Sequence, residues 1–266
     1  MLKTEQRNES TTHIDKMTTA EMVAAIAKEN YNAAKAVEEA SEDIAKAIDA
    51  ITESFRKGGR LFFIGAGTSG RLGILDAAEC PPTFGTDKSQ VVGIIAGGRN
   101  CVFEASENAE DKEENGRADI AEHNLGENDV LVGISVAGGA AYVVGALREA
   151  KKRGAVTVAL TSNYDTPISK ESDIAIVTDT GAEAIMGSTR MKAGSAHKMV
   201  LNMLTTCAMV KTGKIYENVM INLRPTNIKL KKRMINIVSD LANCSAEEAE
   251  KKLDNNEWNI RKALGE

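Results

Sequence analysis

The chain has 266 residues and a net charge of −5. This length suffices for one large domain with appendages, and the negative charge argues against a general nucleic-acid-binding protein, which presents a basic face. The first residues lack the apolar core of a signal peptide, and the longest apolar stretch, residues 199–210, is too short to span a membrane. The four cysteines show no CxxC spacing, which argues against a zinc site or a disulfide framework. We therefore expect a cytoplasmic protein that binds neither nucleic acid nor membranes.

The first part of the chain predicts helices followed by a parallel sheet. Thr18 and Glu21 fit a capping box that opens a long alanine-rich helical region, which ends at Gly58 and Gly59. Apolar runs rich in Val and Ile follow, without clean alternation, as is typical of strands buried on both faces of a sheet. These runs are residues 61–64, 91–96, 130–134, 156–160 and 174–177. Helical segments between several of them predict an α/β fold, with a doubly wound five-stranded parallel sheet flanked by helices.

The remainder of the chain is expected to be helical. A long apolar helix opens within residues 187–195 and ends near Thr212, and a second capping box begins at Ser245. We expect three parts: an N-terminal helical segment at 1–58, an α/β domain at 59–226 and a short C-terminal helical appendage at 227–266.

A glycine-rich turn follows the first expected strand and leads into a helix. Such a turn binds anions, because free N–H groups and the positive end of the helix dipole point into it. We expect this turn to bind a phosphate or phosphosugar through Gly67, Thr68, Ser69 and Gly70. Its glycines also satisfy the GxGxxG dinucleotide fingerprint, but the second strand ends without the acidic residue that would hold the ribose. We therefore expect no nicotinamide or flavin cofactor.

A second candidate anion site opens the long helix after the fifth strand. It combines hydroxyls and cations from Ser188, Thr189, Arg190 and Lys192. A capped helix with a basic first turn is the alternative, although cations at this end oppose the helix dipole.

Carboxylates are the candidates for proton transfer, and Glu79 is the one that its position singles out. Glu79 lies just before Pro81 and Pro82, where we expect the helix to end. Glu110 is one of several carboxylates crowded after the second strand, and spacing alone does not decide which of them faces a site. An exposed surface glutamate is the alternative for each. The histidines share no metal-like spacing, so no metal site is expected.

Several segments of the sequence, taken together, resemble the N-acetylmuramic acid 6-phosphate etherase family. The resemblance rests on the glycine-rich turn at 65–73, ECPPTF at 79–84, ENAED at 107–111 and TEQRN at 4–8. It extends to GAE at 181–183 and GSTRMK at 187–192, a signature that the family shares with the glucokinase regulatory protein.

The resemblance implies a sugar isomerase (SIS) fold, a homodimer, and a sugar phosphate held at the carboxyl ends of the strands. It also implies a lyase that removes D-lactate from N-acetylmuramic acid 6-phosphate and leaves N-acetylglucosamine 6-phosphate, without a metal or redox cofactor. By this resemblance, Glu79 matches the position of the family's proton donor, and Glu110 matches the position of its second catalytic glutamate.

One loop departs from the family pattern. Family members read SASGRTPY after the third strand, whereas residues 135–142 read SVAGGAAY. Ser135 and Gly138 are retained and are expected to bind the substrate, but Ala137, Gly139 and Ala140 replace a serine, an arginine and a threonine. The C-terminal tail is also shorter than is usual in the family. Two alternatives follow: a catalytically silent regulator that binds a sugar phosphate, or a related SIS enzyme acting on another sugar.

Overall fold

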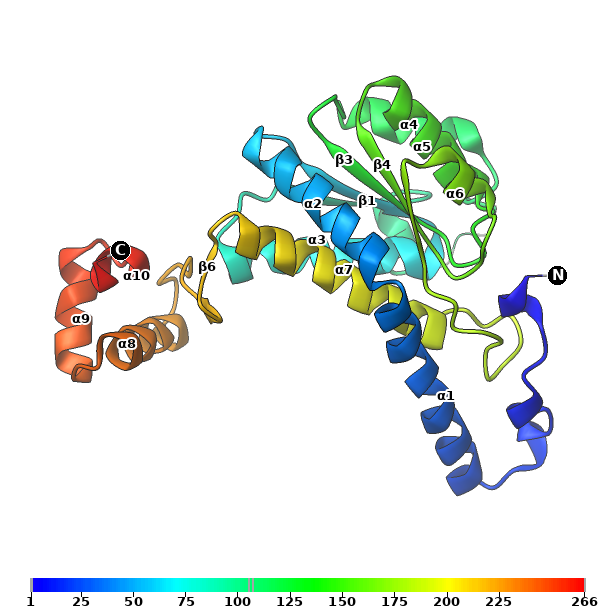
Figure 1. The fold of residues 1–266 in the computed structure, drawn as a ribbon, viewed down its shortest axis with the longest axis horizontal. Helices are drawn as coiled ribbons and strands as arrows, with labels where there is room; N and C mark the ends of the chain where they lie inside the picture. The colour runs from blue at the N-terminus through cyan, green and yellow to red at the C-terminus, as the bar shows by residue number, and fades with distance from the viewer. Residues whose placement is uncertain (1, 105, 107, 266) are drawn as a thin grey trace.

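A parallel sheet lies at the centre of the molecule. The computed structural model describes residues 2–104, 106 and 108–265. The strands run in the order β2-β1-β3-β4-β5, and every neighbouring pair is parallel. Figure 1 labels β1, β3 and β4 of this sheet. They are β1 (Leu61–Gly65), β2 (Val91–Ile95), β3 (Val130–Ile134), β4 (Val156–Thr161) and β5 (Ile174–Val177). The five predicted strands are confirmed, with each end within one residue of its expected position.

Helices cover both faces of the sheet, which confirms the doubly wound α/β fold. One core joins the sheet to α1 (Thr19–Glu39), α2 (Ser41–Arg56), α3 (Gly67–Phe84) and α7 (Lys192–Lys211). The other core joins it to α4 (Glu113–Glu122), α5 (Ala141–Lys152) and α6 (Pro167–Glu171). Alternate side chains of β1 enter opposite cores, with Phe63 on the first face and Phe62 on the second. Such two-sided burial explains why the strands read as continuous apolar runs.

The N-terminal segment returns to the sheet from the far end of α1. The predicted capping box at Thr18 is present, since its side chain and that of Glu21 exchange hydrogen bonds with each other's backbone amides. In Figure 1, α1 projects beyond the sheet, and the preceding chain turns back toward the loop before α7. This preceding chain contains three short 3₁₀ helices, η1 (Lys3–Glu5), η2 (Glu9–Thr11) and η3 (Ile14–Lys16).

Helix α3 does not end where the prolines predicted. It continues through Pro81 and Pro82 to Phe84 and ends at Gly85, which adopts a left-handed conformation with φ of 66°. The fixed φ of proline is compatible with a helix, and its cost is the lost N–H and the crowding of the preceding turn. Burial of Cys80 and Phe84 against the first core offsets that cost.

The C-terminal helices have a core of their own. A two-stranded hairpin of β6 (Ile215–Tyr216) and β7 (Val219–Met220) leads into α8 (Ile228–Ala242), α9 (Ala246–Asn255) and α10 (Ile260–Leu264). Ile221 and Leu223, which precede α8, also join this core. The capping box at Ser245 is confirmed. Within the described chain, no helix is both long and apolar enough to cross a membrane.

Close packing of α4 on α5 generates a stability prediction. A Cβ added to Gly116 would lie 1.9 Å from the carbonyl oxygen of Tyr142, whereas a Cβ on Gly126 would meet nothing within 4 Å. We expect Gly116→Ala to lower the free energy of unfolding by about 2 kcal/mol, because the clash outweighs the better helix propensity of alanine. Urea denaturation measures the difference, with Gly126→Ala as the control. Equal midpoints for the two variants would contradict this packing.

Candidate functional site

A cavity opens where the strand order reverses. The chain leaves β1 toward β2 on one side, and β3 continues the sheet on the other side of β1. Ligands of doubly wound sheets bind in the crevice at this switch point, beyond the carboxyl ends of the strands. A cavity of about 310 Å³ lies there, lined by residues 66–69 after β1 and residues 134–137 at the end of β3.

The turn after β1 offers free donors to this cavity. Helix α3 begins at Gly67, and the backbone amides of Gly67 and Thr68 donate to no atom of the described residues. Thr68 and Ser69, two of the residues expected to bind the anion, also line the cavity. Gly70 does not line it: a Cβ there would lie 2.6 Å from the Gly65 oxygen, so glycine is needed for close packing.

The loop after β3 forms the opposite wall. Ser135 lines the cavity, and its hydroxyl accepts a hydrogen bond from the Gly138 amide at 3.1 Å. Gly138 lies outside the lining, with φ of 75° and Thr166 too close for a side chain. Ala137 and Ala140 line the cavity, so the departures from the family pattern fall on its wall.

The loop before α7 contributes a third wall, and the helix begins within the predicted range 187–195. Thr189 lines the cavity, Ser188 does not, and α7 starts at Lys192. The carboxylate of Glu183 caps this helix by accepting from the amides of Lys192 (3.2 Å) and Ala193 (2.9 Å). Burial raises the pKa of Glu183, although these two hydrogen bonds oppose the shift. The carboxylate of Glu183 thus occupies the N-terminal end of α7, where the sequence predicted a bound anion.

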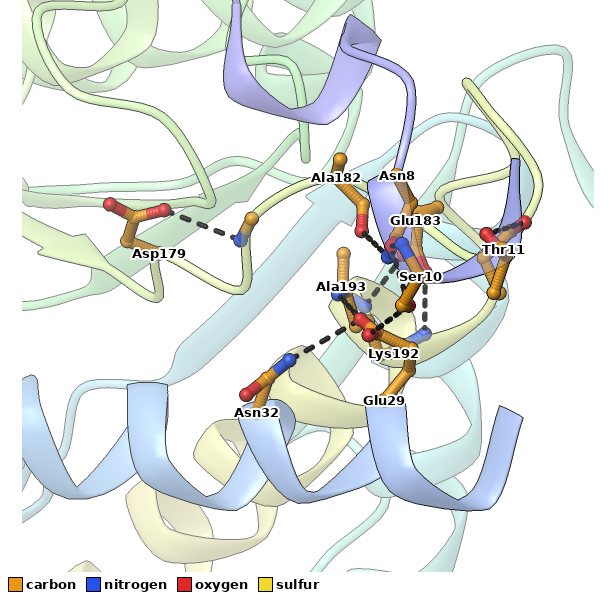
Figure 2. Close-up of polar contacts among 12 residues, drawn as sticks. Asn8, Ser10, Thr11, Glu29, Asn32, Asp179, Ala182, Glu183, Lys192 and Ala193 are labelled. Atoms are coloured by element: carbon orange, nitrogen blue, oxygen red, sulfur yellow. Dashed lines mark hydrogen bonds and ion pairs between the residues drawn. The ribbon is translucent and has the colours of Figure 1, made fainter. Parts of the chain in front are cut away.

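Lys192 is engaged inside the protein. Its Nζ lies 2.5 Å from Oε2 of Glu29 on α1, and its side chain is only 3% exposed. Ser10 and Asn32 donate to the same carboxylate (Figure 2). Burial opposes ionisation of Glu29, but the hydrogen bonds from Lys192 and Ser10 hold its pKa below the ordinary value. Lys192 therefore joins α7 to α1 and does not line the cavity.

No cation lines the cavity among the described residues. Arg190 is exposed and lines a neighbouring cavity of about 350 Å³, together with Lys198. The donors available at the switch point are therefore backbone amides and hydroxyl groups.

The two candidate glutamates lie apart. Glu110 lines the switch-point cavity and also an adjoining cavity of about 420 Å³ that contains Arg71. The amide of Tyr142 donates to the Glu110 carbonyl at 2.9 Å, which ties this segment to α5. Glu79 is exposed near the C-terminal end of α3 and lies outside the lining, about 18 Å along the helix from Gly67. One chain does not bring the two carboxylates together.

Glu5 and His197 also line the cavity. Glu5 belongs to the TEQRN segment that supports the family resemblance, without a role assigned to it, and no motif singles out His197. His197 is fully buried, its Nε2 lies 3.2 Å from the Ser162 hydroxyl, and its Nδ1 has no hydrogen-bond partner among the described residues. Burial lowers the pKa of His197 to about 4. The ring is therefore neutral at pH 7. Within the described residues, no His, Cys, Asp or Glu side chains cluster as a metal site requires.

Comparison with known proteins assigns the family. The chain is 49% identical over 252 residues to an N-acetylmuramic acid 6-phosphate etherase from Photobacterium profundum, covering 95% of this chain and 84% of the relative. It is 47% identical over 263 residues to the etherase of the same name from Clostridium beijerinckii, covering 99% and 86%. The chain belongs to the N-acetylmuramic acid 6-phosphate etherase family. Matches of residues 43–151 to the glucokinase regulatory protein N-terminal SIS domain and of 100–207 to the SIS domain agree with this assignment.

Solved structures show the SIS fold of this etherase-family chain. A phosphoheptose isomerase from Francisella tularensis superposes with a TM-score of 0.54 at 16% identity, covering 74% of this chain and all of that one. At this identity the likeness concerns the fold alone. The SIS fold expected from the resemblance is confirmed.

The buried histidine of this etherase-family chain predicts a pH-dependent stability. The pKa of His197 is about 4 in the folded protein and about 6.5 when unfolded, so only the unfolded chain takes up this proton between those values. The contribution of the neutral His197 ring to the free energy of unfolding is fully present above pH 6.5 and is lost as the pH falls toward 4. We expect wild-type protein to lose about 2 kcal/mol more than His197→Gln between pH 7 and pH 5. Urea denaturation at both pH values measures this, and equal losses would contradict it.

Proposed function

We propose that this protein cleaves the lactyl ether of N-acetylmuramic acid 6-phosphate to give N-acetylglucosamine 6-phosphate and D-lactate. Family membership supports the proposal, since relatives that bear this name are 47–49% identical over nearly the whole chain. The observation that carries it is the switch-point cavity, which combines anion donors with the carboxylate of Glu110.

The phosphate binds to the N-terminal end of α3. The amides of Gly67 and Thr68 are unpartnered among the described residues, and the hydroxyls of Thr68, Ser69 and Ser135 lie in the same lining. Helix N-termini favour anions because their free N–H groups and dipole act together. The altered loop 135–140 offers fewer side-chain donors than the family pattern, but the described chain leaves the amides of Ala137 and Gly139 free to donate.

The reaction needs one group to take a proton and one to supply it. An ether is a poor leaving group, so the C2 proton beside the open-chain aldehyde leaves first and its electron pair forms the C2–C3 double bond as the C3–O bond breaks. We assign the C2 proton to Glu110 and protonation of the departing lactate oxygen to Glu79. Water then adds to the unsaturated sugar, with its oxygen bonding to C3 and a proton returning to C2. Each proton transfer is worth about 10²–10⁴-fold in rate.

Glu79 acts on the site of a partner subunit. It is exposed and distant from the cavity of its own chain, so it contributes only if another copy brings it there. Leu75 lies one turn earlier on the same face of α3 and is 48% exposed, a large apolar side chain that a second subunit would cover. A twofold dimer through this face would carry each Glu79 toward its neighbour's cavity.

Replacement of either glutamate tests the reaction. We expect Glu110→Gln and Glu79→Gln each to lower kcat for D-lactate release from N-acetylmuramic acid 6-phosphate by about 10²–10⁴-fold, because each removes one proton-transfer group. Coupled D-lactate assay of the pure proteins measures this. Glu114→Gln is the control, since Glu114 is exposed on α4 and lines neither cavity. Absence of release from folded wild-type protein would contradict the proposed function.

Mixing the two inactive variants tests the shared site. In a heterodimer of Glu79→Gln and Glu110→Gln, one site keeps both glutamates and the other loses both. A mixture that exchanges subunits randomly should therefore recover about a quarter of the wild-type rate. Size-exclusion chromatography with light scattering checks that a dimer is present. A mixture as inactive as its parents, with subunit exchange demonstrated, would contradict a site that spans two subunits.

A further inference from the structure

The cavity at the switch point holds a second carboxylate that the mechanism above does not use. Among the described residues, Glu5 and Glu110 are the acidic side chains that line it. Glu5 ends the 3₁₀ helix η1, far in sequence from the strands that form the cavity. Its Oε2 would lie 3.4 Å from a Cβ placed on Gly187, so the carboxylate lies against the loop before α7.

Buried contacts hold the chain just before Glu5. Thr4 is fully buried, and its hydroxyl accepts a hydrogen bond from Asn163 Nδ2 at 3.0 Å. The same amide group donates to the carbonyl of Val136, which lines the cavity, at 3.1 Å. One step earlier, Lys3 forms an ion pair with Asp179 at 2.5 Å. Thr4 is therefore connected to the wall of the cavity through the side chain of Asn163.

The chain just after Glu5 is held as well. The side chain of Asn8 donates to the carbonyl of Ala182 at 2.9 Å, and the hydroxyl of Thr11 donates to the carbonyl of Ala184 at 2.8 Å (Figure 2). Ser10 adds a hydrogen bond of 2.8 Å to Glu29, the partner of Lys192. The segment thus follows the loop before α7, and the position of Glu5 is set from both sides.

The Glu5 carboxylate itself has no polar partner in the described chain. No side-chain hydrogen bond or ion pair involves it, and the nearby cations Lys3 and Lys192 are paired with other carboxylates. A half-buried charged group normally gains a partner, since its desolvation is otherwise uncompensated. A carboxylate accepts hydrogen bonds and repels phosphate, so its complement is a hydroxyl or an amide N–H of a ligand.

We propose that Glu5 binds the sugar of the substrate by accepting hydrogen bonds from a hydroxyl or N–H group, and that its charge directs the phosphate toward the α3 turn. This inference rests on the proposed function, because it takes a sugar phosphate as the ligand. It assigns Glu5 a binding role that leaves proton transfer to Glu110 and Glu79.

Binding and kinetics of Glu5→Ala and Glu5→Gln test the assignment, with the affinity tag at the C-terminus. Loss of a hydrogen bond to a charged group should raise KM for N-acetylmuramic acid 6-phosphate and the calorimetric Kd for N-acetylglucosamine 6-phosphate by about 10- to 100-fold. We expect a smaller change in kcat, since the contact is made in the ground state as well. Glu9→Gln is the matched control, because Glu9 is exposed on the same segment and outside the cavity.

Inorganic phosphate separates a direct contact from a structural role. If Glu5 contacts the sugar, Glu5→Ala binds inorganic phosphate as tightly as wild type or more tightly, because a repulsive charge is removed. Equal weakening for phosphate and for the sugar phosphate would overturn the assignment, since Glu5 would then only hold the loop. Unchanged binding of both would overturn it too.

The outcomes also separate this inference from the proposed function. If the wild type releases D-lactate and the Glu5 variants keep the wild-type KM and Kd, the role of Glu5 alone is overturned. Absence of release, combined with weaker N-acetylglucosamine 6-phosphate binding in Glu5→Ala, would overturn the etherase reaction alone. Absence of sugar-phosphate binding to the wild type would overturn both.

Discussion

All five strands run parallel, so their carboxyl ends meet at one edge of the sheet and every loop that follows a strand arrives there. Because the connections on either side of β1 diverge, the loops after β1 and β3 part and leave a crevice between them. The cavity, the free amides of the α3 turn and the lining hydroxyls all follow from this one constraint. The side chains that line the cavity then decide its chemistry.

The buried ion pair between Lys192 and Glu29 keeps a cation of the α7 N-terminus out of the crevice. Because it removes the lysine from the ligand's reach, it leaves a cavity lined by neutral donors and two carboxylates among the described residues. It also joins α1 to α7 at the point where the N-terminal segment docks. Removal of one partner would leave an unpaired charge in a dry environment, which is far more costly than the pair is stabilising. The pair is therefore best understood as a device that fixes geometry.

Local signals in the sequence predicted the sheet, both capping boxes and the turn after β1, because strand burial and helix capping depend on residues within a few positions. The prediction that α3 ends before Pro81 was wrong, since tertiary burial of Phe84 outweighs a local penalty. Lys192 was read as a free cation because its partner lies 163 residues away, where no spacing rule reaches. The places of Glu5 and His197 in the cavity could not be predicted for the same reason. The roles of Glu79 and Glu110 came from family resemblance and stay predictions.

The contacts of the N-terminal segment also bear on the order in which the parts of the protein fold during synthesis. Residues such as Thr4, Asn8 and Thr11 leave the ribosome first, yet their partners lie 159 to 174 residues further along the chain. Contacts of such large sequence separation form late, because the loop between them must close before they contribute. None of the five strands includes residues of this segment, whereas its partners Ala182 and Ala184 lie in the loop after β5. We therefore expect a nascent chain to form its sheet before its binding site is complete.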